Sequence, residues 1–153
     1  MKPVIDIIVP VYRGLEETSR CIKSVVDNPQ QSAYELILIN DASPEPEIQQ
    51  FLQIFAAQHK AVTLLENEHN LGFVATVNRG MSLNPTHDVI LLNSDTEVAN
   101  DWLDRISAAA YSDERIGTVT PFSTNATICS FPVFCKSNPM PNNWPLGELD
   151  SLF

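Results

Sequence analysis

Short segments rich in β-branched residues alternate with amphipathic segments along most of the chain. The expected strands are Val4 to Val11, Glu35 to Asn40, Val62 to Glu66 and Asp88 to Asn93, with a short fifth at Thr118 to Thr120. They are apolar almost throughout, which is typical of strands that are covered on both faces. Helices of about 10–15 residues between such strands require right-handed crossovers. The alternation therefore predicts a Rossmann-like α/β fold, with a mostly parallel sheet and helices on both of its faces.

The segments between the strands have the spacing of helices with one buried face. Their apolar stripes are Leu15, Ile22, Val25 and Val26; Ile48, Phe51, Leu52 and Phe55; Phe73, Val74, Val77 and Met81; and Trp102, Leu103 and Ile106. The first helix is expected to end at Asn28-Pro29 and the third near Asn84-Pro85, since proline disfavours a continuing helix. Cys21 takes a core position in the first helix, so we expect a buried thiol and not a reactive one.

The character of the sequence changes near Pro121. Prolines, asparagines and serines follow without a strong period, which is typical of irregular structure. We therefore expect an α/β domain over residues 1–122 and a Pro-rich irregular segment over residues 123–153. The last residues, from Gly147 to Phe153, begin to look helical just as the sequence stops.

The charge balance excludes several classes of partner. The 153 residues include 9 Lys and Arg against 19 Asp and Glu, a formal net charge of −10. Such a surface repels nucleic acid and anionic lipid, so we expect no nucleic-acid partner and at most peripheral membrane association. No apolar stretch approaches the ~20 residues of a membrane span, and Met1-Lys2-Pro3 leads into a strand instead of a signal peptide. The expected location is the cytoplasm, at most at the inner face of the membrane.

Polar and aromatic residues follow each expected strand. Ligands of open parallel sheets bind beyond the carboxyl ends of the strands, so these residues are the candidates for a site. The first strand ends in Pro10-Val11-Tyr12-Arg13, the second in Asn40-Asp41 and the fourth in Asn93-Ser94-Asp95, while Asn70-Leu71-Gly72-Phe73 follows the third. An aromatic ring, a carboxylate that can accept from a base N–H, a glycine loop and a carboxylate for a divalent ion together predict a nucleoside diphosphate site.

The motifs that are missing narrow the class of ligand. No GxGxxG follows the first strand and no GxxxxGK[ST] is present, which argues against a dinucleotide cofactor and a P-loop. The nearby cations are Arg13 and Arg79, few for a diphosphate that approaches an acidic surface. We therefore expect a divalent metal, Mg²⁺ or Mn²⁺, held by Asp95 with the diphosphate and waters as the remaining ligands.

Four motifs resemble one family in order and spacing. The segments Ile7 to Tyr12, Asn40 to Ser43, Asn70 to Phe73 with Asn78-Arg79-Gly80, and Asn93 to Thr96 with Trp102 to Arg105 resemble the family-2 glycosyltransferases, which have the GT-A fold. The resemblance covers residues 3–122. It implies transfer of a sugar from a UDP- or dTDP-sugar donor to a glycan or lipid-linked acceptor in polysaccharide assembly, with inversion at the anomeric carbon.

The resemblance also implies roles for individual residues. Pro10, Tyr12 and Arg13 are expected to shape the nucleotide pocket, Asp41 to contact the base, Asn70 and Gly72 to pack over the nucleotide, and Arg79 to approach the diphosphate. Asn93, Ser94 and Asp95 occupy the place of the DxD motif, so Asp95 is expected to bind the metal. The rhamnosyltransferase-like subgroup also has asparagine at the first of these positions, so the chain resembles this subgroup there.

The general base of this family comes from a later part of the domain. It is usually an Asp that deprotonates the acceptor hydroxyl, and it is expected beyond Phe153. We therefore expect a truncated GT-A domain that carries the donor-binding half and is inactive by itself. Exposed apolar faces left by such a truncated sheet could drive self-association.

Two other functions remain open at the level of sequence. A non-catalytic binding module derived from a glycosyltransferase has the same motifs. A sugar-phosphate nucleotidyltransferase shares the architecture but has a Gly-rich basic loop after the first strand, which this chain lacks. Asp41 and Asp95 also have structural alternatives, because Asp often closes a strand with an Asx-turn or caps the segment that follows.

Overall fold

The computed structural model describes residues 4–139 and 144–151. The chain divides into two compact units, Met1–Val98 and Ala99–Phe153, which we describe separately. The far end of the helix expected to run to Phe153 lies outside the described residues.

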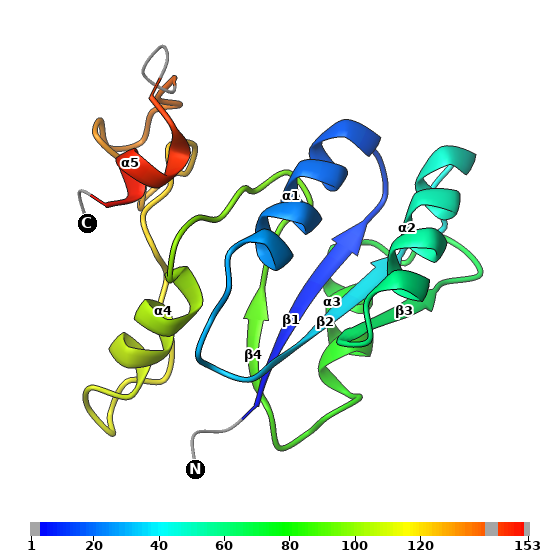
Figure 1. The fold of residues 1–153 in the computed structure, drawn as a ribbon, viewed down its shortest axis with the longest axis horizontal. Coiled ribbons are helices and arrows are strands. Elements are labelled where there is room, and N and C mark those ends of the chain that lie inside the picture. The colour runs from blue at the N-terminus through cyan, green and yellow to red at the C-terminus, as the bar shows by residue number, and fades with distance from the viewer. Residues whose placement is uncertain (1–3, 140–143, 152–153) are drawn as a thin grey trace. The chain divides into compact units, whose positions relative to one another are not determined.

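A four-stranded parallel sheet forms the centre of the first unit. Its strands are β1 (Ile5–Val11), β2 (Tyr34–Asn40), β3 (Val62–Glu66) and β4 (Asp88–Leu91), in the spatial order β3-β2-β1-β4 (Figure 1). The register pairs Val11 with Asn40, and Asn40 with Glu66. The carboxyl ends of β1, β2 and β3 therefore lie in one row.

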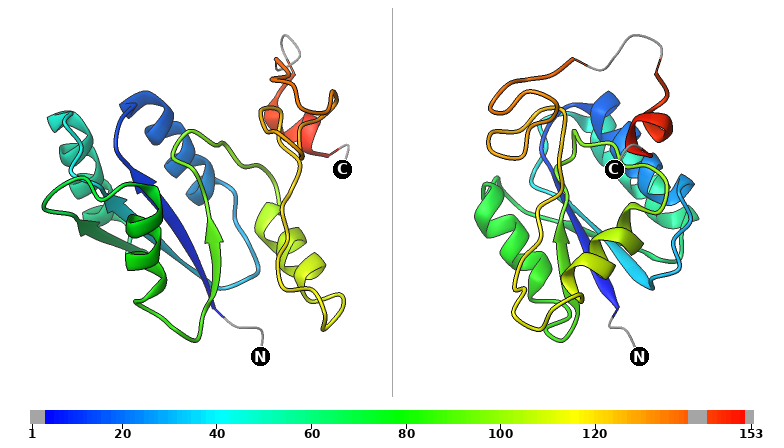
Figure 2. Two further views of the ribbon diagram at one scale, coloured as in Figure 1. Left: turned by 180° about the vertical axis from the view of Figure 1, so that it is seen from behind. Right: turned by 90° about the vertical axis from the view of Figure 1, so that its left-hand side faces the viewer.

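Helices cover both faces of this sheet. Helices α1 (Leu15–Asp27) and α2 (Pro46–Gln58) lie on one face and α3 (Phe73–Met81) on the other (Figures 1 and 2). The central strands are accordingly the most buried, with Ile7, Ile8 and the run Leu36–Ile39 fully inaccessible to solvent. This arrangement confirms the predicted α/β fold and the apolar character expected of doubly covered strands.

A glycine directly precedes two of these helices. Gly14 precedes α1 with φ +83° and Gly72 precedes α3 with φ +76°, a region that side chains with a Cβ rarely adopt. The Gly14 N–H also donates to the Glu45 carboxylate at 3.3 Å. Gly14 lies three residues beyond the end of β1 and Gly72 six residues beyond the end of β3, so the glycines help to set the loops at the carboxyl edge.

Some local expectations were wrong. Strand β4 stops at Leu91 instead of Asn93, and the described residues 118–120 form no strand. Phe73 and Val74 do not join the core, since they are 50% and 68% exposed. The buried face of α3 consists instead of Thr76, Val77 and Gly80. The buried face predicted from the apolar residues of this short helix therefore differs from the observed one by about one residue along the sequence.

The second unit contains helices α4 (Trp102–Ala110) and α5 (Leu146–Asp150). The guanidinium of Arg105 forms ion pairs with Asp101 and Asp150, and so joins the two helices. The described residues between them, 111–139 and 144–145, are irregular, as expected, but isolated bridges pair Ser123 with Ser130 and Asn125 with Ser137. In the described part of the chain, none of the helices has the length and apolar character needed to cross a membrane.

Gly80 allows α3 to approach the sheet closely. A Cβ at this position would lie 3.0 Å from Ile39 Cδ1 and from Ile8 Cγ2. We expect Gly80→Val to lower the free energy of unfolding by about 2 kcal/mol through overpacking, measured by urea denaturation. The matched control is Ala75→Val on the exposed side of the same helix. Helix propensity cannot cause the loss at position 80, because valine is a somewhat better helix former than glycine, whereas at position 75 it is worse than alanine. A Gly80→Val variant that is as stable as the wild type would contradict the close approach.

Candidate donor-binding site

The strand ends bring the predicted residues to one edge of the sheet. Asp41 directly follows β2, and its backbone N–H donates to the carbonyl of Val11 at the end of β1 (2.8 Å). On the other side of β1, the Leu92 N–H donates to the Ile8 carbonyl (3.0 Å), which carries the β4 pairing toward Asn93. The loops after all four strands therefore begin at the same edge, where α/β sheets bind their ligands.

A pocket of about 170 Å³ opens at this edge. Its walls come from the ends of β1 and β2 and from the loop that leads into α3. The lining residues are Pro10, Val11, Tyr12, Asp41, Asn70, Gly72 and Phe73. The structure thus brings together five of the predicted residues and adds Val11 and Phe73. Arg13, Arg79, Asn93, Ser94 and Asp95 do not line this pocket.

The carboxylate of Asp41 holds the loop before α3. Oδ1 accepts from the Leu71 N–H (2.9 Å) and Oδ2 from the Gly72 N–H (3.0 Å). Oδ1 also accepts from Asn67 Nδ2 at 2.7 Å, and Asp41 is only 4% exposed. The Asx-turn considered for Asp41 belongs instead to its neighbour, because Asn40 Oδ1 accepts from the Ser43 N–H (2.8 Å). Asp41 therefore fixes the loop that forms one wall of the pocket.

The hydrogen bonds of Asp41 favour its ionised form. Burial by itself raises the pKa of this carboxyl, but hydrogen bonds from the Leu71 N–H, Asn67, Thr76 and the Gly72 N–H outweigh it and hold the pKa below its usual value. The site therefore carries a fixed negative charge near neutral pH. An N–H donor on a ligand suits such a group better than an acceptor does.

Asn67 and Thr76 support this carboxylate and were missed as site residues. Asn67 is buried at the end of β3, and its Nδ2 donates to Asp41 and to Thr76 Oγ1 (3.1 Å). Its Oδ1 accepts from Arg79 Nη1, which also donates to the Glu66 carbonyl at 2.8 Å. Arg79 therefore binds the end of β3. No sequence signal separates Asn67 from an ordinary turn asparagine.

Tyr12 presents an aromatic ring beside the pocket. The ring is not absorbed into the core, since the residue is 39% exposed, and the guanidinium carbon of Arg13 lies 5.3 Å from its centroid. This distance is within the range of a cation–π contact. The end of β1 thus offers an apolar surface and a positive charge side by side.

The segment Asn93–Asp95 packs against α1. The Asn93 carbonyl accepts from Cys21 Sγ (3.3 Å) and from the Thr96 N–H (3.1 Å), which closes a turn. Burial raises the pKa of Cys21 to about 12; the Thr96 N–H opposes this, and the charges of Asp95 and Glu97 add to it. The expectation of a buried thiol at Cys21 is confirmed, and the raised pKa is consistent with low reactivity. Asp95 itself is exposed at the carboxyl edge.

The donor set at this turn suits a cation that retains other ligands. Within the described residues, His, Cys, Asp and Glu side chains do not gather in groups of three or more that could hold a metal. A lone exposed carboxylate such as Asp95 fits Mg²⁺ or Mn²⁺, which keep waters and take phosphate oxygens. It does not fit a structural metal, which needs a full set of protein ligands.

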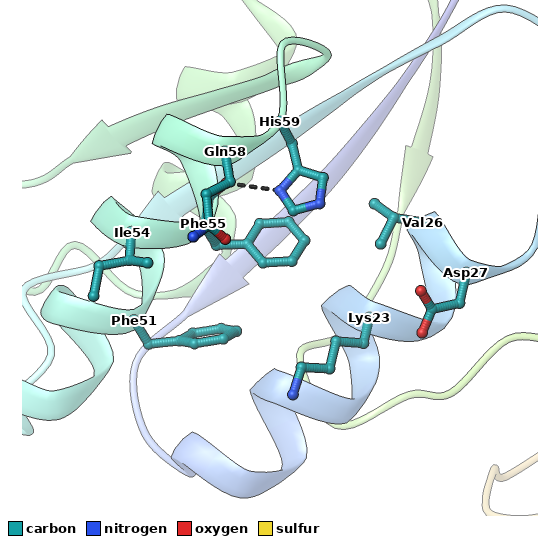
Figure 3. A pocket seen from close by; sticks show the side chains of 8 residues that line it. All are labelled: Lys23, Val26, Asp27, Phe51, Ile54, Phe55, Gln58 and His59. Atoms are coloured by element: carbon teal, nitrogen blue, oxygen red, sulfur yellow. Dashed lines mark hydrogen bonds between the residues drawn. The ribbon is translucent and has the colours of Figure 1, made fainter.

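A larger hollow, of about 370 Å³, lies between α1 and α2 (Figure 3). Its wall on α2 carries Phe51, Phe55 and His59, and the Phe55 and His59 rings stack at 4.1 Å. His59 Nδ1 is occupied by the Phe55 carbonyl (2.9 Å). The hollow is formed by the sides of helices and not by strand ends, so the smaller pocket is the better candidate for chemistry.

Solved structures with the same architecture are glycosyltransferases of the GT-A fold. The mannosyltransferase PcManGT from Pyrobaculum calidifontis, in complex with GDP-Man and Mn²⁺, matches with a TM-score of 0.54 and 19% identity, over 63% of this chain and 29% of its own. GalNAc-T7 with UDP, GalNAc and Mn²⁺ matches with a TM-score of 0.63 and 20% identity, over 73% of this chain and 22% of its own. These similarities confirm the predicted GT-A fold.

Sequence comparison defines the family. Residues 6–127 match the family model of glycosyl transferase family 2, so the chain belongs to this family. An uncharacterized glycosyltransferase of Haemophilus influenzae is 23% identical over 74% of this chain and 35% of its own length. Glycosyltransferase AglE of Haloferax volcanii is 25% identical over 67% of this chain and 34% of its own. The chain thus spans about a third of the length of these relatives, and its predicted family membership is confirmed.

Proposed function

We propose that this chain binds the nucleoside diphosphate part of an activated sugar at the carboxyl edge of its sheet. The sugar is then transferred, with inversion, to a glycan or lipid-linked acceptor. The observation that carries the proposal is the pocket itself. It combines the half-exposed ring of Tyr12 and the ionised Asp41 at adjoining strand ends, in a chain of glycosyl transferase family 2.

The residues near β2 suit the base of such a donor, and those near β4 suit its diphosphate. Tyr12 and Phe73 offer rings on which a planar base can stack, and Asp41 offers an acceptor for a base N–H. Strands β2 and β4 flank β1, so their ends are separated by two strand spacings, about 10 Å. A ligand with its base beside β2 and its diphosphate near β4 would extend along the edge toward Asp95.

A divalent cation would reduce the repulsion between the diphosphate of the donor and this acidic chain. The chain has a net charge of −10, and the nearby Asp41 is ionised, so a bare diphosphate would meet a repulsive surface. Mg²⁺ or Mn²⁺ held by Asp95 would supply charge neutralisation of the diphosphate leaving group. The Mn²⁺ bound to PcManGT and to GalNAc-T7 supports this choice of cofactor.

Activation of the acceptor is assigned to a residue beyond Phe153. The relatives are about three times as long as the aligned region, which gives room for the expected general base. The matched region contains the donor-binding edge, so we propose that donor binding can be tested with this chain alone. UDP and dTDP are the expected nucleotides, and GDP joins the panel because PcManGT binds GDP-Man.

The proposal is tested by calorimetric titration of UDP, dTDP and GDP with Mn²⁺ and with EDTA. We expect at least one nucleotide to bind, and its affinity to rise about tenfold with the metal, equivalent to about 1.4 kcal/mol. Failure of all three to bind would favour the non-catalytic module. Release of pyrophosphate from a sugar phosphate and a nucleoside triphosphate would favour the nucleotidyltransferase.

A further inference from the structure

Four side chains form a continuous hydrogen-bonded relay beneath the candidate pocket. Arg79 donates to Asn67, and Asn67 donates to Asp41 and to Thr76. Asp41 in turn accepts from the N–H groups of the loop that leads into α3. The relay joins the ends of β2 and β3 to both ends of α3, and its last members form the pocket wall.

The relay depends on the orientation of the Asn67 amide. An amide has one acceptor oxygen and one donor nitrogen, and only the nitrogen can face a carboxylate favourably. Arg79 has donors but no acceptor, so its contact with Oδ1 directs Nδ2 toward Asp41 and Thr76. The Asn67 backbone is also fixed, because its N–H donates to the Asn40 carbonyl (2.9 Å). Arg79 therefore selects the amide orientation that Asp41 requires.

The same contacts occupy the guanidinium of Arg79. Nη1 donates both to the Glu66 carbonyl and to Asn67, two acceptors at the end of β3. The register places this end beside β2, which lies between β3 and β1, whereas Asp95 follows β4 at the opposite edge of the sheet. The strand order thus separates the end of β3, which Arg79 binds, from the end of β4 by three strand spacings, about 14 Å.

From these contacts we infer that Arg79 is a positioning residue and not a diphosphate ligand. Acting through Asn67, it holds Asp41 and the loop Asn70–Gly72 in the conformation that receives the nucleoside. This inference rests on the proposed function only for the identity of the ligand. It differs from the diphosphate contact that the family resemblance implies for Arg79, and the two roles have different consequences.

The experiment compares UDP with uridine, which lacks the phosphates. Arg79→Met removes every donor, whereas Arg79→Gln keeps an amide donor without a charge. We expect Arg79→Met to weaken UDP and uridine by the same factor, about tenfold, and Arg79→Gln to restore part of the loss for both. Lys23→Met, which removes an exposed cation from α1, is the control and should change neither affinity. Both affinities can be followed by NMR titration.

Two outcomes of the titration would overturn the inference. A loss for UDP that clearly exceeds the loss for uridine would place Arg79 on the diphosphate. Equal effects of Arg79→Gln and Arg79→Met on UDP alone would identify the charge as the important property. In the double variant Arg79→Met with Asn67→Ala, the relay predicts no further loss beyond that of Asn67→Ala, because both changes break the same contact.

A measurement without ligand separates this inference from the proposed function. The relay predicts that Arg79→Met accelerates amide hydrogen exchange at Leu71 and Gly72, whose N–H groups bind Asp41, while exchange in β1 is unchanged. Unchanged exchange at Leu71 and Gly72 would contradict the relay. If the wild-type protein binds no nucleotide, the proposed function is wrong, and the exchange data alone decide whether the relay exists.

Discussion

Replacing Asp41 with alanine is expected to lower the free energy of unfolding by about 3 kcal/mol. The change leaves the Leu71 N–H, the Gly72 N–H and Asn67 Nδ2 without their acceptor, in a place where the side chain is 4% exposed. Each unsatisfied buried donor costs about 1–3 kcal/mol, and water entering the space offsets part of this cost. Urea denaturation of the wild type and the variant measures the difference.

Two further variants show whether the loss comes from the contacts of Asp41. Asp27→Ala removes an exposed carboxylate from the last turn of α1, and we expect a change below about 0.5 kcal/mol. Asp41→Asn keeps one acceptor oxygen but turns a donor toward one of the three N–H groups, so its loss should be intermediate. A loss below about 1 kcal/mol for Asp41→Ala would mean that the loop does not depend on this carboxylate.

The pKa of Asp41 gives this contribution a definite pH dependence. Since the folded-state pKa lies below the unfolded value of 3.8, the unfolded chain binds the proton more readily. The stabilisation by Asp41 is therefore complete above pH 3.8 and is lost as the pH falls through the lower, folded-state pKa. The difference in stability between wild type and Asp41→Asn should thus shrink below pH 3.8. A difference that is independent of pH down to pH 2 would contradict the hydrogen-bond arrangement.

The sequence was sufficient to predict the fold because its strands are unusually clear. Ile7 to Val9 and Leu36 to Ile39 read as strands covered on both sides, and all of these residues are fully buried. Short elements were less certain. The apolar residues Phe73 and Val74 suggested a buried face for α3, but their position at the start of the helix places them near the pocket and exposed to solvent.

The sequence could predict only those site residues whose positions follow directly from the order of the parallel strands. Tyr12 and Asp41 directly follow β1 and β2, so parallel pairing alone places them together. Asn67 and Arg79 could not be assigned in this way, because their contacts depend on the orientation of an amide and on the path of a long side chain. Hydrogen bonds of this kind depend on tertiary structure and leave no pattern in a single sequence.

Asp95→Asn is expected to abolish the effect of Mn²⁺ on nucleotide binding. The amide retains the shape of the carboxylate but loses the charge that attracts a divalent cation. We therefore expect the affinity for UDP in the presence of Mn²⁺ to fall at least about tenfold, to the value that the wild type shows in EDTA. Glu97→Gln is a matched control, since it removes a half-exposed carboxylate two residues away that pairs with Arg20 (3.0 Å). It should keep the response to the metal.

The converse substitution tests the same site by a gain. Asn93→Asp adds a second carboxylate to the turn whose backbone carbonyl is held by Cys21 and Thr96, so the backbone need not change to accommodate it. A second negative oxygen ligand should tighten Mn²⁺ and raise the metal-dependent part of UDP affinity, provided that Asp95 is present. If Asn93→Asp restores metal dependence in a chain that carries Asp95→Asn, the cation is bound by the turn as a whole. If the wild type and Asp95→Asn bind UDP equally well with Mn²⁺, Asp95 is not a metal ligand, and the charge of the diphosphate must be neutralised by cationic side chains.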